Sequence, residues 1–143
     1  MTTVACDGKS LAADGMVTGS DAVHMLSFPK ARRLPDGSVF AWSGQPNDGD
    51  AWERFLSGTD AEIRASDGSE AIRLFLGGEI ICYNEIGRGY KQSAPCATGS
   101  GVKFALAAML AGAPSKRAVE IACELDVYSG GTIIELVPEL PQA

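Results

Sequence analysis

The stretch from Thr2 to Gly15 reads TTVACDGKSLAADG and predicts a β-hairpin at the start of the chain. Thr2–Cys6 is a short β-prone run, Asp7-Gly8 is a strong two-residue hairpin turn, and Lys9–Ala13 is the returning strand. Asp14-Gly15 then ends the second strand. The first 44 residues continue in this manner, as β structure interrupted by glycine turns.

Outward from this hairpin, the pattern predicts further strands, three helices and a terminal strand pair. The predicted strands are Ser38–Trp42, Ala71–Leu76 and Glu79–Asn84, followed near the end by a pair around Gly130-Gly131 whose second arm is Thr132–Val137. The predicted helices are Ala51–Leu56 with N-caps in Asn47–Asp50, Val102–Ala111, and one that begins at Ser115 as its cap. Strands, two adjacent helices and strands again predict one layered α+β domain over residues 1–143.

Composition narrows the class of protein. The chain has 143 residues with 18 acidic and 12 basic side chains, and its net charge of −6 argues against a nucleic-acid partner. No apolar run is long enough to span a membrane and no signal peptide is visible. The four cysteines form no Cys-x-x-Cys pair and His24 cannot complete a zinc set with them. We therefore expect reduced thiols, no metal site and a cytoplasmic location.

Familiar catalytic motifs are absent. Gly99-Ser100-Gly101 precedes a helix, but Phe104 stands where a third glycine would complete a dinucleotide-binding motif. There is no Gly-x-Ser-x-Gly nucleophile elbow, and nothing near His24 marks it as a catalytic histidine. Asn47–Asp50 lacks the bidentate glutamate of a calcium loop, so helix capping explains it better.

The start of the chain offers a different nucleophile. Methionine is normally removed when a small residue such as threonine follows it, which would leave Thr2 with a free α-amine beside its own hydroxyl. The hydroxyl can attack while the amine, with a pKa near roughly 8, takes the proton. Because many proteins begin Met-Thr, this interpretation needs partners elsewhere in the chain.

Seven short blocks supply such partners and occur in one order along most of the chain. They are Thr2-Thr3-Val4, Leu11–Gly15, Lys30–Leu34, Ala41–Gly44, Trp52–Leu56, Gly99-Ser100-Gly101 and Asp126–Gly131. In this order they resemble proteasome β subunits and the bacterial HslV peptidase, which are N-terminal-nucleophile threonine hydrolases. The resemblance implies a four-layer αββα sandwich and a threonine-type endopeptidase.

The same resemblance implies a catalytic role for six residues. Thr2 would be the nucleophile, Lys30 the buried cation that lowers the proton affinity of its hydroxyl, and Asp14 the carboxylate that keeps Lys30 charged. From the residues alone, Lys30 could equally belong to a solvated basic run with Arg32 and Arg33. Three further residues would surround the threonine amine: Ser100, Asp126 and Ser129.

Substrate contacts are implied in the same way. The backbone N–H near Ser43-Gly44 would form the oxyanion hole, and Thr18 would pair its main chain with an extended peptide. Ala41 would lie at the base of the pocket for the residue before the scissile bond. No cofactor is predicted, apart from a monovalent cation such as Na⁺ on carbonyls near Cys123, Asp126 and Ser129.

Two departures from the family bear on assembly. The first hairpin is shorter than in the relatives, and between Leu56 and Cys96 a second long helix is missing, with Thr59–Glu70 in its place. The family implies peptide or unfolded-protein substrates, a homo-oligomeric ring and an ATPase unfoldase partner, and the missing helix puts the ring and the ATPase in doubt. Two alternatives stay open: a non-catalytic structural or regulatory subunit that retains Met1, and an amidase for a small amide.

Overall fold

The computed structural model describes residues 2–141 and contains short strands and helices joined by tight turns. In chain order the elements are the strands β1 (Thr3–Cys6), β2 (Leu11–Ala13), β3 (Val17–Gly19), β4 (Ala22–Met25), β5 (Ala31–Arg33) and β6 (Val39–Ser43), the helix α1 (Asp48–Leu56), the strands β7 (Glu70–Leu74), β8 (Ile80–Tyr83), β9 (Gly89–Gln92) and β10 (Cys96–Gly99), the helices α2 (Val102–Leu110) and α3 (Ser115–Leu125), and the strand β11 (Ile134–Leu136).

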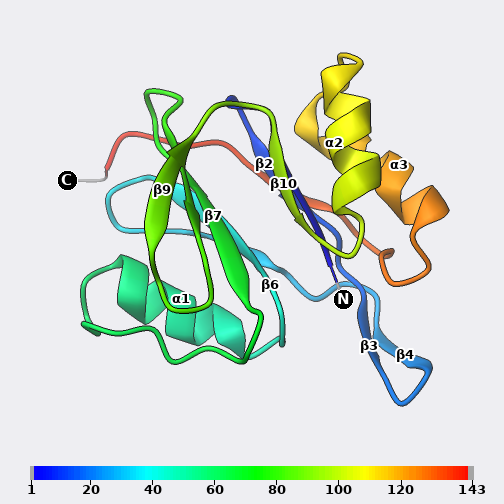
Figure 1. Ribbon diagram of the computed structural model, residues 1–143, viewed down its shortest axis with the longest axis horizontal. Helices are drawn as coiled ribbons and strands as arrows, with labels where there is room; N and C mark the ends of the chain where they lie inside the picture. The colour runs from blue at the N-terminus through cyan, green and yellow to red at the C-terminus, as the bar shows by residue number, and fades with distance from the viewer. Residues whose placement is uncertain (1, 142–143) are drawn as a thin grey trace.

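Two antiparallel sheets stack face to face between layers of helix (Figure 1). One sheet has the strand order β10-β1-β2-β11 and the other the order β5-β6-β7-β8-β9. Helices α2 and α3 cover the outer face of the first sheet, and α1 packs on the outer face of the second. The predicted four-layer αββα sandwich is therefore confirmed. Strands β3 and β4 pair with each other and project from one end as a hairpin.

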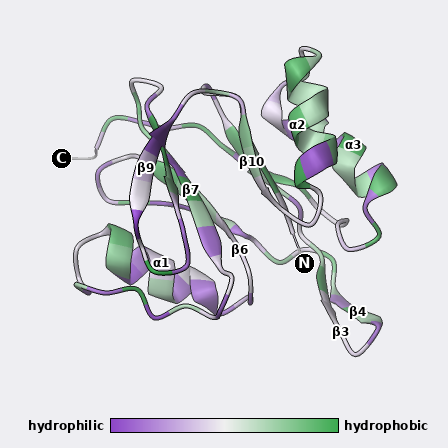
Figure 2. Ribbon diagram, viewed as in Figure 1, coloured by the Kyte–Doolittle hydropathy of each residue, from purple (hydrophilic) through white to green (hydrophobic). Residues whose placement is uncertain are grey.

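Strand alternation sorts the apolar side chains into separate cores. On β1, Val4 and Cys6 face the second sheet while Ala5 faces α2 and α3. On β6, Val39 and Ala41 likewise face inward, whereas Phe40 and Trp42 pack toward α1. The helices that cover these strands differ in hydropathy. In Figure 2, α2 is hydrophobic along most of its length, whereas α1 alternates between hydrophilic and hydrophobic residues. No helix in residues 2–141 is long and apolar enough to cross a membrane.

Several local predictions were wrong. The hairpin β3–β4 and the strand β9 were not predicted. The residues of β4 and β9 are all exposed and those of β3 are half-buried, so none of these strands carries a buried apolar pattern. Ser115 does not cap α3, because its hydroxyl donates to the Ser10 carbonyl oxygen over 2.9 Å and accepts from the Asp7 N–H over 2.8 Å. Asn47 stands at the N-cap of α1 and makes no side-chain capping bond.

The predicted strand pair around Gly130-Gly131 is also wrong in its first arm. Residues Asp126–Ser129 form a tight turn, in which the Ser129 N–H donates to the Asp126 carbonyl oxygen over 3.2 Å. Strand β11 pairs instead with β2, with Ile134 opposite Ala13. The loop of residues 57–69 follows α1 where the sequence indicated a missing helix.

Candidate active site

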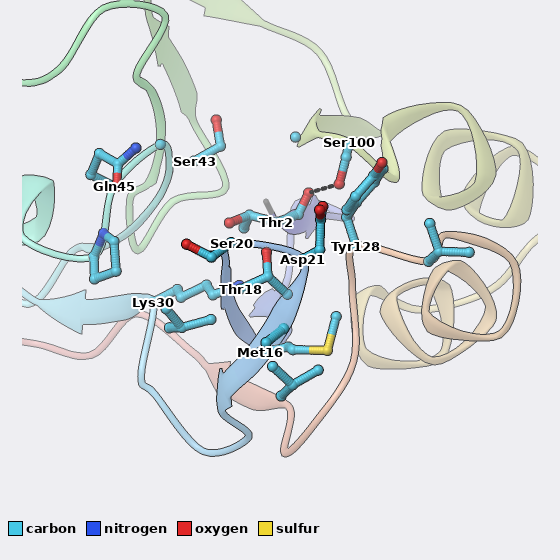
Figure 3. Close-up of a pocket in the computed structure, with 18 of the residues that line it drawn as sticks. Thr2, Met16, Thr18, Ser20, Asp21, Lys30, Ser43, Gln45, Ser100 and Tyr128 are labelled. Atoms are coloured by element: carbon cyan, nitrogen blue, oxygen red, sulfur yellow. Dashed lines mark hydrogen bonds between the residues drawn. The ribbon is translucent and has the colours of Figure 1, made fainter.

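A cavity of about 680 Å³ opens where the start of β1, the end of β6 and the hairpin β3–β4 meet (Figure 3). Most of the residues that the sequence assigned to a site line this cavity, although they lie far apart in the chain. They are Thr2, Thr18, Lys30, Ser43, Gly44 and Ser100. Asp14 and Asp126 lie behind the lining and are bonded to Lys30 and Ser100, and Ser129 is bonded in turn to Asp126.

Lys30 and Asp14 form a buried ion pair in the cavity wall. The Lys30 Nζ lies 2.8 Å from the Asp14 Oδ1, and the two side chains are 5% and 0% exposed. Burial lowers the pKa of Lys30 below its ordinary value, and the Asp14 carboxylate opposes that shift. Asp14 also accepts hydrogen bonds from the N–H groups of Thr3 (3.1 Å) and Gly130 (3.0 Å), so its oxygens are held from three segments. The solvated alternative for Lys30 is thereby excluded.

Strand register brings these groups together. Val4 pairs with Ala13, so Asp14 follows β2 beside the start of β1 and its N–H donates to the Thr3 carbonyl oxygen over 3.1 Å. Gly99 must be glycine, since its φ is +99° and an added Cβ would lie 1.9 Å from the Thr2 carbonyl oxygen. The close approach of β10 to Thr2 therefore depends on this residue.

Ser100, Asp126 and Ser129 form one hydrogen-bonded network. The hydroxyls of Ser100 and Ser129 each donate to Asp126 Oδ2 over 2.6 Å, and the Ser100 hydroxyl also lies 3.3 Å from the Thr2 carbonyl oxygen. Burial would raise the pKa of Asp126, but the hydrogen bonds from the two serines outweigh it and hold that pKa below the ordinary value. Asp126 therefore keeps its negative charge, and the Ser100 hydroxyl links it to the Thr2 carbonyl oxygen.

Comparison with solved structures identifies this architecture. BPH from Thiobacillus denitrificans in complex with epoxomicin is 17% identical, with a TM-score of 0.70 over 99% of both chains. BPH from the same organism, in a second structure, is 18% identical with the same TM-score and coverage. HslV from Trypanosoma brucei is 22% identical, with a TM-score of 0.71 over 96% of this chain and 98% of that one. This chain has the HslV fold. No family model and no curated protein matches it.

The HslV fold confirms, at the level of architecture, the resemblance predicted from the sequence. At these low identities the fold carries no residue-by-residue assignment, so the roles of the site residues rest on their geometry in this chain. One assignment is wrong. Ala41 is fully buried in the core between the sheets and does not line the cavity. Successive side chains of β6 point to opposite faces, and its neighbour Trp42 lines the cavity instead.

Thr3 is a site residue that the sequence analysis quoted but gave no role. Its hydroxyl lies 2.7 Å from the Ser129 hydroxyl, and it is fully buried. Together with its N–H bond to Asp14, this contact joins the ion pair to the Asp126 network through one residue. Its position directly after Thr2 at the start of the predicted strand was the available signal.

The Cys123 thiol lies close to the ion pair and to Asp126, but it is not a second nucleophile. Burial raises the pKa of the Cys123 thiol to about 11, so that thiol is neutral at pH 7 and does not compete as a nucleophile. No group of three or more histidine, cysteine or acidic residues within 2–141 could hold a metal ion. The predicted monovalent cation and the absence of any other cofactor stay predictions. The removal of Met1 concerns a residue outside those that the structure describes.

Proposed function

We propose that this chain is a threonine peptidase whose nucleophile is the hydroxyl of Thr2, with Met1 removed so that the Thr2 α-amine is free. One observation carries the proposal: Thr2, Lys30 of the buried ion pair and Ser100 of the Asp126 network line a single cavity. The HslV fold gives further support, since one BPH structure with that fold holds epoxomicin.

In the first step, the Thr2 hydroxyl oxygen attacks the carbonyl carbon of the scissile peptide bond, and the Thr2 α-amine takes the hydroxyl proton. The positive charge of Lys30 favours loss of that proton, because it stabilises negative charge on the attacking oxygen. The electron pair of the carbonyl moves onto its oxygen. The N–H of Gly44 stabilises this oxyanion by donating a hydrogen bond.

In the second step, the oxyanion collapses and the carbon–nitrogen bond breaks. The leaving amine takes the proton from the Thr2 ammonium, which leaves an ester on the Thr2 oxygen. Water then attacks the ester, passes a proton through the same amine, and releases the acid product with the hydroxyl restored. The Asp126 carboxylate, bound by Ser100 and Ser129, favours the ammonium form while the amine holds the proton.

We propose an extended peptide or unfolded polypeptide as substrate. Thr18 belongs to β3, lies on the cavity and is half-buried, which supports main-chain pairing between this strand and a bound peptide. The HslV fold supports the further proposal of a homo-oligomeric ring, which sedimentation of the purified chain would test. The ATPase unfoldase and the cytoplasmic location stay predictions.

The deciding experiment is intact mass spectrometry after treatment with a peptide epoxyketone. The Thr2 hydroxyl adds to the ketone and the free amine opens the epoxide, so one adduct reports both groups. We expect a chain without Met1 that gains one inhibitor mass, hydrolyses fluorogenic peptides, and loses both properties in Thr2→Ala. Thr2→Ser should keep measurable activity, and Thr59→Ala, an exposed threonine outside the cavity, should behave as wild type.

Three results would overturn the proposal. Hydrolysis that survives Thr2→Ala would assign the nucleophile elsewhere. A mass that includes Met1, with neither adduct nor hydrolysis, would favour the non-catalytic subunit. Hydrolysis of small amides with no cleavage of peptides would favour the amidase instead.

A further inference from the structure

The segment Ser43–Gln45, between β6 and α1, forms part of the cavity wall in an unusual backbone conformation. Gly44 has a φ of +133°, which a residue with a side chain rarely adopts. A Cβ on Gly44 would lie 2.6 Å from Asp48 Oδ2 and 2.8 Å from the Ser69 hydroxyl. The backbone at this point is therefore pressed directly against two polar side chains.

Hydrogen bonds fix three backbone groups of this segment, the Ser43 carbonyl and both backbone groups of Gln45. The Ser69 hydroxyl donates to the Ser43 carbonyl oxygen over 2.9 Å, and the Gln45 N–H donates to Asp48 Oδ2 over 2.8 Å. The Gln45 carbonyl oxygen accepts from the Trp42 indole N–H over 3.1 Å. Within residues 2–141 the Gly44 N–H has no hydrogen-bond partner, which leaves it available at the cavity.

Ser69 acts on the peptide unit that carries this available N–H. The Ser43 carbonyl and the Gly44 N–H belong to the same peptide group, so a donor on the carbonyl both orients the N–H and strengthens it as a donor. Ser69 is fully buried, and its hydroxyl in turn accepts from the Trp52 indole N–H over 2.9 Å. Because Trp52 is itself fully buried on α1, the hydroxyl cannot rotate without losing a buried bond.

Asp48 holds the other side of the segment. It is 4% exposed, and besides Gln45 it accepts from the Ser66 N–H over 2.9 Å and the Ser66 hydroxyl over 2.5 Å. One buried carboxylate thus ties the cavity segment, the first turn of α1 and the loop of residues 57–69 together. This loop occupies the region where the sequence lacks a helix, so the loop that replaces it takes part in fixing the cavity wall.

We propose that Ser69 is a positioning residue of the peptidase, which aims the Gly44 N–H at the oxyanion, and that Asp48 supports it from the opposite side. The inference rests on the proposed function, since it needs an oxyanion at the cavity. Losing an oxyanion-hole donor outright costs about 10²–10³ in rate. Loss of the group that aims the donor should cost less, on the order of 10- to 100-fold in kcat with little change in KM.

Ser69→Ala is the test, and the chain offers a matched control in Ser115→Ala. Ser115 is also fully buried, donates to a backbone carbonyl over 2.9 Å and accepts from an N–H, but it lies outside the cavity. Both variants are purified with wild type, checked for Tm, and assayed for kcat and KM with a fluorogenic peptide. Binding of a peptide aldehyde, whose adduct carries the oxyanion, is compared with binding of the unreactive peptide amide.

We expect Ser69→Ala to lower kcat and weaken the aldehyde by 10- to 100-fold while the amide binds as in wild type. Ser115→Ala should change none of these, whatever its Tm. Ser69→Cys, which keeps the volume and a weaker donor, should be intermediate, and it carries the test if the alanine variant does not fold. Equal kcat in Ser69→Ala and Ser115→Ala, or loss of amide and aldehyde binding together, would overturn the inference. A wild-type chain with no hydrolysis would instead overturn the proposed function.

Discussion

The two walls of the cavity differ in how they are built. The inner wall consists of Thr2, Lys30, the segment Ser43–Gln45 and Ser100, and it belongs to the stacked sheets. The hairpin wall is β3–β4, whose strands pair with each other and project from the end of the sandwich (Figure 1). Polar groups of the inner wall are tied to buried partners from distant parts of the chain, whereas the residues of β4 are all exposed.

This difference suits the inner wall to catalysis and the hairpin wall to substrate selection. Chemistry needs groups held within a fraction of an ångström, and only the inner wall has the buried contacts to do so. The hairpin wall contributes little to the core, so its residues can vary at small cost in stability and can select what enters. We therefore expect substitutions in the inner wall to change stability and rate together, and substitutions in the hairpin wall to change only substrate preference.

The largest effect is expected from breaking the ion pair of the inner wall. Asp14→Asn leaves Lys30 buried without its counter-charge, which should lower the free energy of unfolding by about 3–5 kcal/mol and abolish hydrolysis. Urea unfolding measures the loss. As a control, Glu120→Gln breaks an exposed ion pair with Arg117, in which the charged atoms lie 3.6 Å apart. This change should lower the free energy of unfolding by less than about 1 kcal/mol. Equal losses in the two variants would contradict the difference between buried and exposed regions.

The next largest effect is expected from adding a methyl group behind Thr2, the proposed nucleophile. In Gly101→Ala the Cβ would lie 1.9 Å from the Thr3 hydroxyl oxygen and 3.2 Å from the Ala122 Cβ. This overpacking should lower the free energy of unfolding by about 1–3 kcal/mol and displace the start of β1. Its backbone φ of −91° suits alanine, which isolates the packing effect. Gly77→Ala, with nothing within 4 Å of its Cβ, should stay within about 0.5 kcal/mol of wild type. A smaller loss at Gly101 than at Gly77 would show that the helix start adapts.

Asp126 gives a pH-dependent prediction. Its folded pKa is lowered below the ordinary 3.8, so its charge stabilises the fold above that pH, and the contribution is lost as the pH falls through the folded pKa. Asp126→Asn should therefore cost about 1–2 kcal/mol at pH 5–7, with the gap to wild type closing below about pH 4. Denaturant unfolding at a series of pH values measures the gap. A gap that stays constant down to pH 2 would contradict a depressed pKa.

Sequence reasoning was most successful where a side chain follows a recognisable turn or strand. Asp14 ends the predicted first hairpin, whereas the pairing of Lys30 with Asp14 was implied by the family resemblance alone, since no strand was predicted after Lys30. Ser69 and Asp48 could not be found in this way, because their importance comes from contacts between α1, the 57–69 loop and the cavity segment. Nothing local distinguishes a buried serine from an exposed one in a glycine- and serine-rich loop.

Errors in strand face and strand existence have a related cause. Ala41 was assigned to the cavity from its block alone, and a shift of one residue moves a side chain to the opposite face of a sheet. The hairpin β3–β4 was missed because exposed and half-buried strands outside the core need no apolar alternation. The region that sequence reasoning described least well is thus the hairpin wall, where few buried contacts constrain the residues.

The smallest effect is expected in that wall, at Asp21. This residue lies in the β3–β4 turn with a φ of +60° and lines the cavity, and no hydrogen bond or ion pair of its side chain occurs within residues 2–141. The other charge in the lining, on Lys30, is already paired with Asp14. The rim therefore carries one unpaired negative charge, which should favour substrates with a lysine or arginine side chain within its reach. Asparagine also tolerates positive φ, so Asp21→Asn removes the charge and keeps the turn.

We expect Asp21→Asn to reduce the preference in kcat/KM for a lysine peptide over its norleucine counterpart by about two- to fivefold, since exposed charge pairs contribute little. The lysine is moved through successive positions of a fluorogenic peptide to find where the preference is greatest. Asp67→Asn, an exposed aspartate outside the cavity, is the matched control and should leave the preference unchanged. Raising the salt to about 0.5 M should reduce the wild-type preference as well, because screening weakens exposed pairs. A preference that persists in Asp21→Asn would place specificity in the inner wall, and the two walls would then share the task of selecting substrate.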